Sequence, residues 1–367
     1  MKQATREQHC VIKERDGLID AIKAIAIILV VVGHCIQYGS GDTYRLEYSY
    51  YDNWLFRLIY SFHMPLFMII SGYLFYYSVQ KCKHVFEIVV KKFDSLIIPV
   101  LIWSFLMYLC NCLSLSDEKP LYEVMCGYFK YTITNLWFLW ALFFCSIIVA
   151  FVNKYMGDNL LFYILLIVLS FFAPDAYNIY LYKFTFPFFL SGYFFNKNHS
   201  KLDIINVKSG RMFCLFIALF CVLYVFFDSE KLVYLSGFSI FQDDGKWAYH
   251  CYINVYRFII GLVGAVTVIL AFAIIYPKIN NRTKKILSFI GQRTMGIYIV
   301  STVLFIYVLK NITIRLPWIN YWVLLFESVV MVAISLAITS FLQENEIIGK
   351  LLLGCRRDPR NNNMRNR

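Results

Sequence analysis

The stretch DGLIDAIKAIAIILVVVGH at residues 16–34 decides the fold, because it is an apolar run long enough to cross a bilayer. After Asp16 at its start, the stretch contains three further ionisable residues, Asp20, Lys23 and His34. At 3.6 residues per turn, Lys23 and His34 share one helix face about 16 Å apart along the axis, and Asp20 joins that face. Ionisable groups in lipid are costly and usually face protein or water, so this helix is the first candidate for function. For Asp20 and Lys23, snorkelling to the membrane interface is the alternative.

The composition excludes an ordinary soluble protein. The 367 residues are 60% hydrophobic, 19% aromatic and only 16% charged, which leaves too little polar surface. We therefore expect an all-α fold, a polytopic bundle of transmembrane helices. The polar residues 1–17 hold no short apolar segment with a cleavage site, so the first helix is expected to be retained. The eleven cysteines show no CxxC pair and are interpreted as small hydrophobic side chains.

Windows of about twenty apolar residues predict ten membrane spans. They cover residues 18–38, 54–76, 94–114, 135–153, 159–174, 178–195, 211–228, 253–276, 287–309 and 318–342. The connections on the side of the N-terminus hold 24 Lys and Arg, and those on the other side hold 7. The positive-inside rule therefore places both termini in the cytoplasm and explains the net charge of +12 without nucleic acid. We expect one membrane domain over 1–343 and a basic, disordered cytoplasmic tail over 344–367 that contacts anionic lipids.

Two segments far apart in the chain have similar sequences. SFHMPLFMIISGYLF at 61–75 and FTFPFFLSGYFF at 184–195 each combine a proline with Ser-Gly-Tyr. The prolines predict kinks, and Ser-Gly predicts close contact between helices. The first segment contains His63, which an antiparallel packing of the first two helices brings to the level of His34. Two imidazoles there would form an acid-base site, whereas the alternative is that His63 only bonds a neighbouring helix.

For the other polar residues within or near the predicted spans, the sequence allows two interpretations each. Arg57 and Arg257 lie about one turn inside the outer face, where each either snorkels or supplies a cation to a buried site. The outer segment with Asp243, Asp244 and Trp247 suits a carbohydrate or an ordinary aromatic belt. Neither His34 nor His63 has the i, i+4 partner of a zinc motif, so no metal is expected. The chain has no GxSxG elbow and no P-loop, which excludes the usual serine hydrolases and ATP-driven pumps.

These features together resemble acyltransferase family 3, the integral-membrane acyltransferases that modify bacterial glycans, and in particular its sugar O-acetyltransferase branch. The matching segments are DGLIDAIKAIAIILVVVGH at 16–34, SFHMPLFMIISGYLF at 61–75, NLWFLWALFF at 135–144, FPFFLSGYFF at 186–195 and IGQRTMGIYIV at 290–300. They extend over nearly the whole chain. Two departures stand out: Ser301 and Thr302 follow the Ile-Tyr where many relatives carry a histidine, and the chain ends soon after its last predicted span.

The resemblance implies a site and a reaction. The family's basic residue and histidine, separated by ten residues, correspond to Lys23 and His34, which makes His34 the catalytic base. Acyl-CoA is expected from the cytoplasm, and the acceptor on the other side of the membrane. A nearby cation, Arg57 or Arg257, would stabilise the oxyanion, while Lys23 with Asp20 would position the acyl donor.

The remaining candidates concern the two substrates. The basic residues predicted to attract the nucleotide phosphates of CoA are Lys278, Arg282, Lys284 and Lys285, although topology alone also explains their charge. The acceptor-side candidates are Trp137, Trp247, Asp243 and Asp244. We expect an acetyltransferase, or a succinyltransferase, of the bacterial inner membrane that uses acetyl-CoA as co-substrate. Its partners would be a glycan or lipid-linked sugar, lipids, and a second copy or a glycan-assembly protein. The alternatives are a flippase of lipid-linked saccharides and a non-catalytic scaffold.

Overall fold

The computed structural model describes residues 16–38, 50–114, 120–198, 209–240, 245–309 and 321–354, and all regular structure in these ranges is helical. The α-helices are α1 (Gly17–Tyr38), α2 (Trp54–Lys81), α3 (Val85–Lys92), α4 (Ile98–Ser114), α5 (Leu121–Thr134), α6 (Trp137–Tyr155), α7 (Leu160–Ser170), α8 (Ile179–Asn198), α9 (Ser209–Val225), α10 (Val233–Ser236), α11 (Trp247–Ile275), α12 (Asn281–Gly291), α13 (Thr294–Tyr307), α14 (Tyr321–Leu342) and α15 (Glu346–Leu353). The short helical turns are η2 (Tyr50–Asp52), the π-helical η3 (Phe93–Ile97), η4 (Ser229–Lys231) and η5 (Tyr276–Lys278). The all-α prediction is confirmed.

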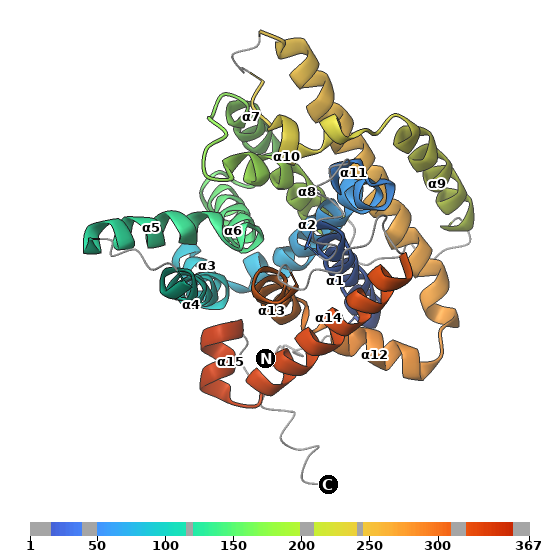
Figure 1. Ribbon diagram of the computed structural model, residues 1–367. Helices are drawn as coiled ribbons and strands as arrows, with labels where there is room; N and C mark the ends of the chain where they lie inside the picture. Colours follow the sequence, from blue (N-terminus) through green and yellow to red (C-terminus); the bar gives the residue numbers. More distant parts are fainter. Residues whose placement is uncertain are drawn as a thin grey trace, which may run out of the picture.

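The helices α1 and α2 lie at the centre of the bundle (Figure 1). Helix α1 packs against α2, α12, α13 and α14, while α2 packs against α8 and α11. Apart from a few residues such as Asp20, Lys23 and His34, α1 is apolar, and 67% of its apolar window is buried by the surrounding helices. The candidate residues of α1 therefore lie in the interior of the protein and not on its lipid face.

The crossing of α2 and α8 depends on two glycines. A Cβ atom at Gly72 would lie 1.9 Å from the carbonyl oxygen of Phe189, and one at Gly192 would lie 1.8 Å from that of Ile69. Each glycine thus admits the backbone of the opposite helix. The close contact predicted from the two Ser-Gly segments is confirmed.

Replacing Gly72 with valine is expected to lower the midpoint of thermal unfolding in detergent. The added side chain must displace helix backbone, and overpacking of this kind costs about 1–3 kcal/mol or more. Gly210→Val on α9 is the matched control, because no atom lies within 4 Å of its added Cβ. Equal midpoints for the two variants would contradict the tight crossing.

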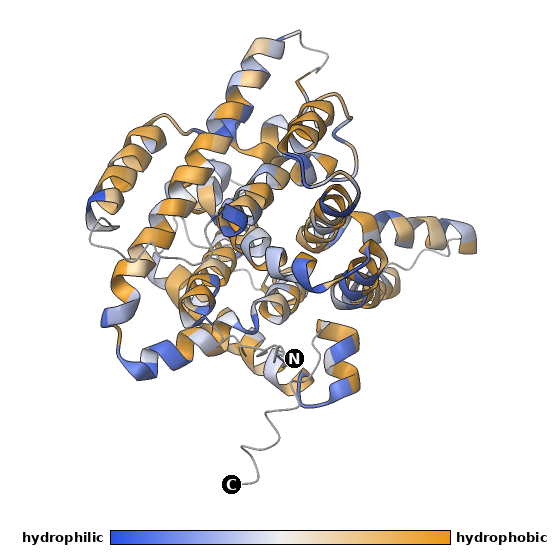
Figure 2. Ribbon diagram, turned by 180° about the vertical axis from the view of Figure 1, so that it is seen from behind, coloured by the Kyte–Doolittle hydropathy of each residue, from blue (hydrophilic) through white to orange (hydrophobic). Residues whose placement is uncertain are grey.

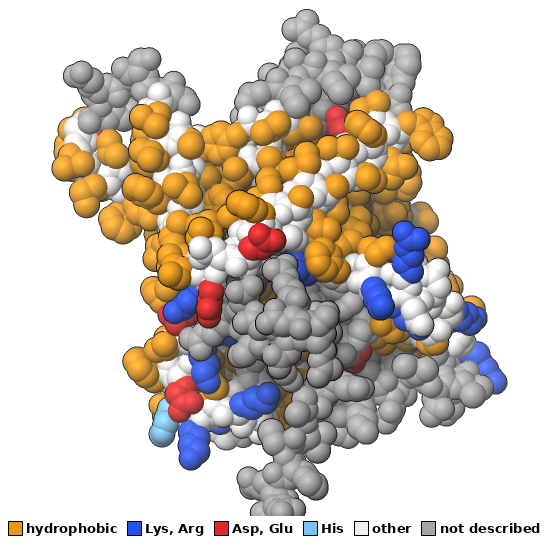
Figure 3. Space-filling view, turned by 90° about the horizontal axis from the view of Figure 1, so that it is seen from below, with side chains coloured by type: hydrophobic (Ala, Val, Ile, Leu, Met, Phe, Trp, Pro, Cys, Tyr) orange, Lys and Arg blue, Asp and Glu red, His pale blue; other side chains and the backbone are white. Residues whose placement is uncertain are grey.

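The protein is a multi-pass membrane protein. Within the described ranges, six helices are long and apolar enough to cross a membrane, and α12 with α13, bent by 66°, makes a further candidate. Figure 2 shows hydrophilic positions on α12 and α15, whereas the long helices are mostly hydrophobic. Figure 3 shows a broad area of hydrophobic side chains with charged ones gathered below it. This arrangement fits a bilayer around the bundle.

The ten predicted spans do not correspond one to one with the helices. The fifth span, 159–174, contains α7, which has only 11 residues and is about 16 Å long, too short for a bilayer core of about 30 Å. The ninth span, 287–309, is divided by the bend between α12 and α13. Apolar length alone does not reveal where a helix ends or turns, so the count of ten is not confirmed.

The C-terminal segment differs from its prediction. Residues Glu346–Leu353 form α15, which was expected to be disordered. Leu353 is fully buried, and the Trp103 indole of α4 donates a 2.8 Å hydrogen bond to the Leu352 carbonyl. Contact with α4 therefore stabilises a helix too short to persist alone. The remaining tail, 355–367, lies outside the described residues.

Candidate active site

A cavity of about 400 Å³ lies at the end of α1 that carries His34, and we call it the His34 cavity. Helices α1, α2, α5, α6, α8, α10 and α13 and the turn η2 contribute to its walls. The polar side chains among its lining residues are His34, Gln37, Thr134, Asn135, Asn178 and Thr302, and the aromatic ones are Tyr38, Tyr50, Tyr51, Phe56, Tyr60, Trp137, Tyr180, Tyr234 and Tyr298. Aromatic faces mixed with amides and hydroxyls are typical of small-molecule sites.

The imidazole of His34 is oriented by its own helix. Its Nδ1 lies 3.1 Å from Oε1 of Gln37, three residues later on the same face of α1. An amide oxygen only accepts, so Nδ1 carries the proton and Nε2 has a free lone pair. The ring also packs against Phe305 of α13, with centroids 5.3 Å apart. His34 is thus held in the tautomer that a general base requires.

The second histidine, His63, is not among the described residues that line the His34 cavity. It is buried, and its Nδ1 donates a 2.8 Å hydrogen bond to the carbonyl of Ile59. Its ring lies edge-on to Tyr60, 4.5 Å between centroids, and Tyr60 itself lines the cavity. Gly33 leaves room for that tyrosine, since a Cβ there would lie 2.6 Å from the Tyr60 ring. The structure therefore gives His63 a place beside Tyr60 and no direct exposure to the cavity.

The acid and the base near the start of α1 form an ion pair, with 3.5 Å between Lys23 Nζ and Asp20 Oδ1. Asp20 is buried, and its Oδ2 accepts hydrogen bonds from Ser288 and Gln292. A Cβ at Gly291 would lie 1.9 Å from the Asp20 carbonyl oxygen, so α12 packs directly on α1 here. Asp20 therefore joins the two helices and neutralises Lys23 in part.

Lys23 lines a second cavity, of about 110 Å³, which we call the Lys23 cavity. Its other lining residues are Ile27, Val30, Met64, Phe67, Ile70, Ser71, Leu74, Leu96, Phe138, Leu139, Leu142, Thr294, Met295 and Tyr298. This set is almost entirely apolar. The structure thus separates Lys23 and His34 into two different environments on one helix face.

The two arginines do not line the His34 cavity in the described structure. Arg57 extends towards α9 and donates a 3.5 Å hydrogen bond to the Phe227 carbonyl. Arg257 is 3% exposed, and its guanidinium donates to the carbonyls of Lys231 and Gly237, each at 2.6 Å. In this structure its donors hold the segment before α11 in place, and its role at an oxyanion stays a prediction.

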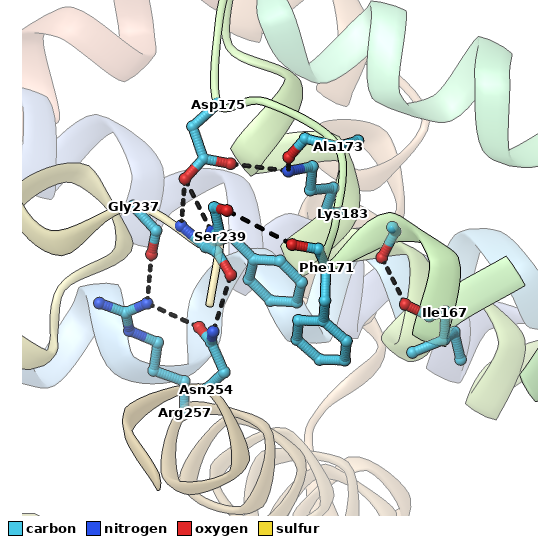
Figure 4. Close-up of polar contacts among 11 residues, drawn as sticks. Ile167, Phe171, Ala173, Asp175, Lys183, Gly237, Ser239, Asn254 and Arg257 are labelled. Carbon is cyan, nitrogen blue, oxygen red and sulfur yellow. Dashed lines mark hydrogen bonds and ion pairs between the residues drawn. The ribbon is translucent and has the colours of Figure 1, made fainter. Parts of the chain in front are cut away.

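That segment belongs to a larger buried network (Figure 4). The Asp175 carboxylate bonds Lys183 Nζ of α8 at 2.8 Å and accepts the backbone N–H groups of Phe238 and Ser239, each at 2.8 Å. Asn254 of α11 donates a 2.8 Å hydrogen bond to the Phe238 carbonyl. The network ties α8, α11 and the segment after α10 together, and so fixes the wall that carries Tyr234.

The acceptor-side candidates separate in the structure. Trp137 lines the His34 cavity, at a break where Leu136 has a left-handed backbone (φ 48°) between α5 and α6. Trp247 is 62% exposed at the start of α11 and does not line this cavity in the described structure. Asp243 and Asp244 lie outside the described residues.

The basic residues proposed to bind CoA lie on and beside α12, at the Lys23 end of α1. Lys278, Arg282 and Lys285 are exposed, while Lys284 is half-buried over the Tyr276 ring, 5.1 Å from its centroid. The first three have their charges free to face solvent or lipid headgroups. None of the four lines the Lys23 cavity in the described structure.

Most of the tyrosines and Asn178 were missed by sequence reasoning. They come from connections far apart in the chain, so no local spacing marks them. A phenol is already neutral near pH 7, and burial raises the pKa of Tyr50 and Tyr234 further above that range. The cavity therefore presents neutral hydroxyl donors around His34.

Comparison with known proteins identifies the family of the chain. A family model described as an acyltransferase domain matches residues 16–340. The Nodulation protein NolL of Mesorhizobium japonicum is 30% identical over 182 residues, 49% of this chain and 48% of that protein. The NolL protein of Sinorhizobium fredii is 30% identical over 219 residues, 57% of each chain.

The chain thus spans about half the length of the curated relatives it matches. No solved structure matches it. Because the family model covers most of its length, the chain belongs to acyltransferase family 3, and its long apolar helices make it a multi-pass membrane protein.

Proposed function

We propose that this acyltransferase moves an acetyl group, or less readily a succinyl group, from acyl-CoA to a hydroxyl of a cell-envelope or exported glycan in the bacterial inner membrane. One observation supports this most: His34, whose Nδ1 lies 3.1 Å from Oε1 of Gln37, lies on the wall of a polar, aromatic cavity. A sugar offers hydroxyls to the amides and apolar ring faces to the aromatic side chains.

The reaction follows from the orientation of the imidazole. Nε2 of His34 takes the proton of the acceptor hydroxyl, whose oxygen attacks the thioester carbonyl. A tetrahedral oxyanion forms, and neutral phenols and amides of the cavity are the donors available to stabilise it. When the C–S bond breaks, the imidazolium returns its proton to the departing CoA thiolate. The products are the O-acyl glycan and free CoA.

The donor is proposed to approach from the Lys23 end of α1. The positive-inside rule assigns that end to the cytoplasm, where acyl-CoA is found. Lys23 and the exposed Lys278, Arg282 and Lys285 supply positive charge for the phosphates of CoA. Lys284 contributes less, because Tyr276 and the Pro277 carbonyl already engage its ammonium.

Gln37 is proposed to position His34. Gln37→Leu removes the acceptor for Nδ1–H of His34. Without this hydrogen bond the imidazole is less well oriented, and a rise of about 1.4 kcal/mol in the activation free energy should lower kcat about tenfold. Gln37→Glu keeps an acceptor oxygen and should retain most of the rate. Initial rates of acyl transfer at saturating substrates measure both. Equal losses in the two variants would contradict the positioning role.

The proposed function is tested with purified protein in proteoliposomes. Labelled acetyl-CoA and a cell-envelope glycan are supplied, and base-labile label on the glycan is counted. We expect ester formation that depends on the protein. Absence of ester, together with movement of a lipid-linked saccharide across the vesicle membrane, would favour a flippase and contradict the assignment of donor and acceptor.

A further inference from the structure

The His34 cavity and the Lys23 cavity follow one another along the bundle. On α1, Ile27 and Val30 line the Lys23 cavity, and His34 lines the other. The step from Val30 to His34 is four residues, or about 6 Å along the axis. The two cavities are therefore neighbours on a single helix face.

The other helices repeat this order. On α13, Met295 lines the Lys23 cavity and Thr302 lines the His34 cavity, while on α2 the corresponding residues are Met64 and Tyr60. Helices α1 and α13 run from the Lys23 cavity to the His34 cavity, and α2 runs the opposite way. On each of these three helices, residues of the Lys23 cavity and of the His34 cavity therefore follow one another in the same spatial order.

Tyr298 lies at that level. Among the described lining residues it is the one shared by both cavities. Its ring meets Phe138 of α6 edge-on, with centroids 5.9 Å apart. Its backbone is held in α13, where its carbonyl accepts hydrogen bonds from Ser301 and Thr302. The wall between the two cavities at this point is consequently an aromatic side chain on a fixed helix.

We propose that Tyr298 is the gate between a donor cavity and an acceptor cavity, an inference that rests on the proposed direction of acyl transfer. In the closed position its ring separates Lys23 from His34. The ring turns into the larger His34 cavity when the thioester advances, and the carbonyl then comes within reach of the base. The turn requires a change of rotamer, loss of the contact with Phe138 and free volume, and the His34 cavity of about 400 Å³ supplies the volume.

Such a gate has a chemical purpose. A thioester exposed to the polar cavity without an acceptor would be hydrolysed, because His34 activates water as readily as a sugar hydroxyl. Keeping the ring closed until donor and acceptor are both bound prevents that loss. Tyr298 is in this sense a positioning residue that sets specificity for the glycan over water.

The experiment measures access and hydrolysis separately. Val30→Cys places a thiol in the Lys23 cavity, and a membrane-impermeant methanethiosulfonate is applied to either face of sealed vesicles. Labelling at position 30 is counted by peptide mass spectrometry in three backgrounds: unchanged, Tyr298→Phe and Tyr298→Ala. Tyr180→Ala, on a wall of the His34 cavity that the Lys23 cavity does not share, is the control for a merely larger cavity.

We expect Tyr298→Ala to raise labelling from the His34 side at least tenfold, with no change in Tyr298→Phe or Tyr180→Ala. Release of CoA from acetyl-CoA without an acceptor should rise in Tyr298→Ala over the unchanged protein, and Tyr180→Ala serves as a control for labelling only. Equal labelling in all backgrounds, or a Tyr298→Phe variant as open as Tyr298→Ala, would overturn the gate. If labelling changes as expected but the unchanged protein transfers no acetyl group, the gate stands and the proposed function fails.

Discussion

Replacing His34 with glutamine is expected to lower kcat for acyl transfer by a factor of about 10² to 10⁴. Glutamine fills similar space but cannot take the proton of the acceptor hydroxyl. The walls of the cavity, including Trp137 and Tyr60, remain in place. Initial rates with labelled acetyl-CoA measure the loss, and the midpoint of thermal unfolding shows whether the variant is folded.

His63→Gln is the matched comparison. Its side chain is buried against Tyr60 and bonds the Ile59 carbonyl, which the glutamine amide can still reach. We expect less than a tenfold loss of rate, through a small displacement of Tyr60. A loss as large as that of His34→Gln would show that both histidines take part directly, as the sequence predicts.

The second large effect is expected from Arg257→Met. The methionine leaves the buried carbonyls of Lys231, Gly237 and Leu232 without their donor, and each such loss costs about 1–3 kcal/mol. The midpoint of thermal unfolding should fall steeply. Acyl transfer should fall as well, because the released segment carries Tyr234.

Arg57→Met provides the control for that experiment. Arg57 makes a single hydrogen bond of 3.5 Å to the Phe227 carbonyl and does not line the His34 cavity in the described structure. We expect a small change in unfolding midpoint and in rate. If Arg257→Met behaves like Arg57→Met, the buried network does not hold the cavity wall.

The sequence predicted the fold class because apolar length and charge asymmetry are local properties of the chain. The helical crossing at Gly72 and Gly192 was predictable for the same reason, since Ser-Gly within an apolar run signals close packing. The positions at which the helices end could not be predicted from the sequence. The bend between α12 and α13 and the docking of α15 both depend on tertiary contacts, such as Asp20 with Gly291.

Some residues of the candidate site could likewise be found from local sequence spacing, and others could not. His34 and Lys23 were predictable because their spacing places both on one helix face. The network of Asp175 and Lys183 was missed, although a lysine within an apolar span is a signal for a buried partner. For Arg257 the sequence left snorkelling and a buried cation site open, because it does not show that carbonyls 20 to 27 residues earlier fold back onto the guanidinium.

The central claim is that donor and acceptor reach His34 from opposite ends of α1, and sidedness tests it most directly. Right-side-out vesicles are loaded with labelled acetyl-CoA, and the glycan acceptor is supplied outside. We predict labelled ester on the external glycan, and none when labelled acetyl-CoA is supplied only outside. Transfer that requires donor and acceptor on the same face would contradict the account.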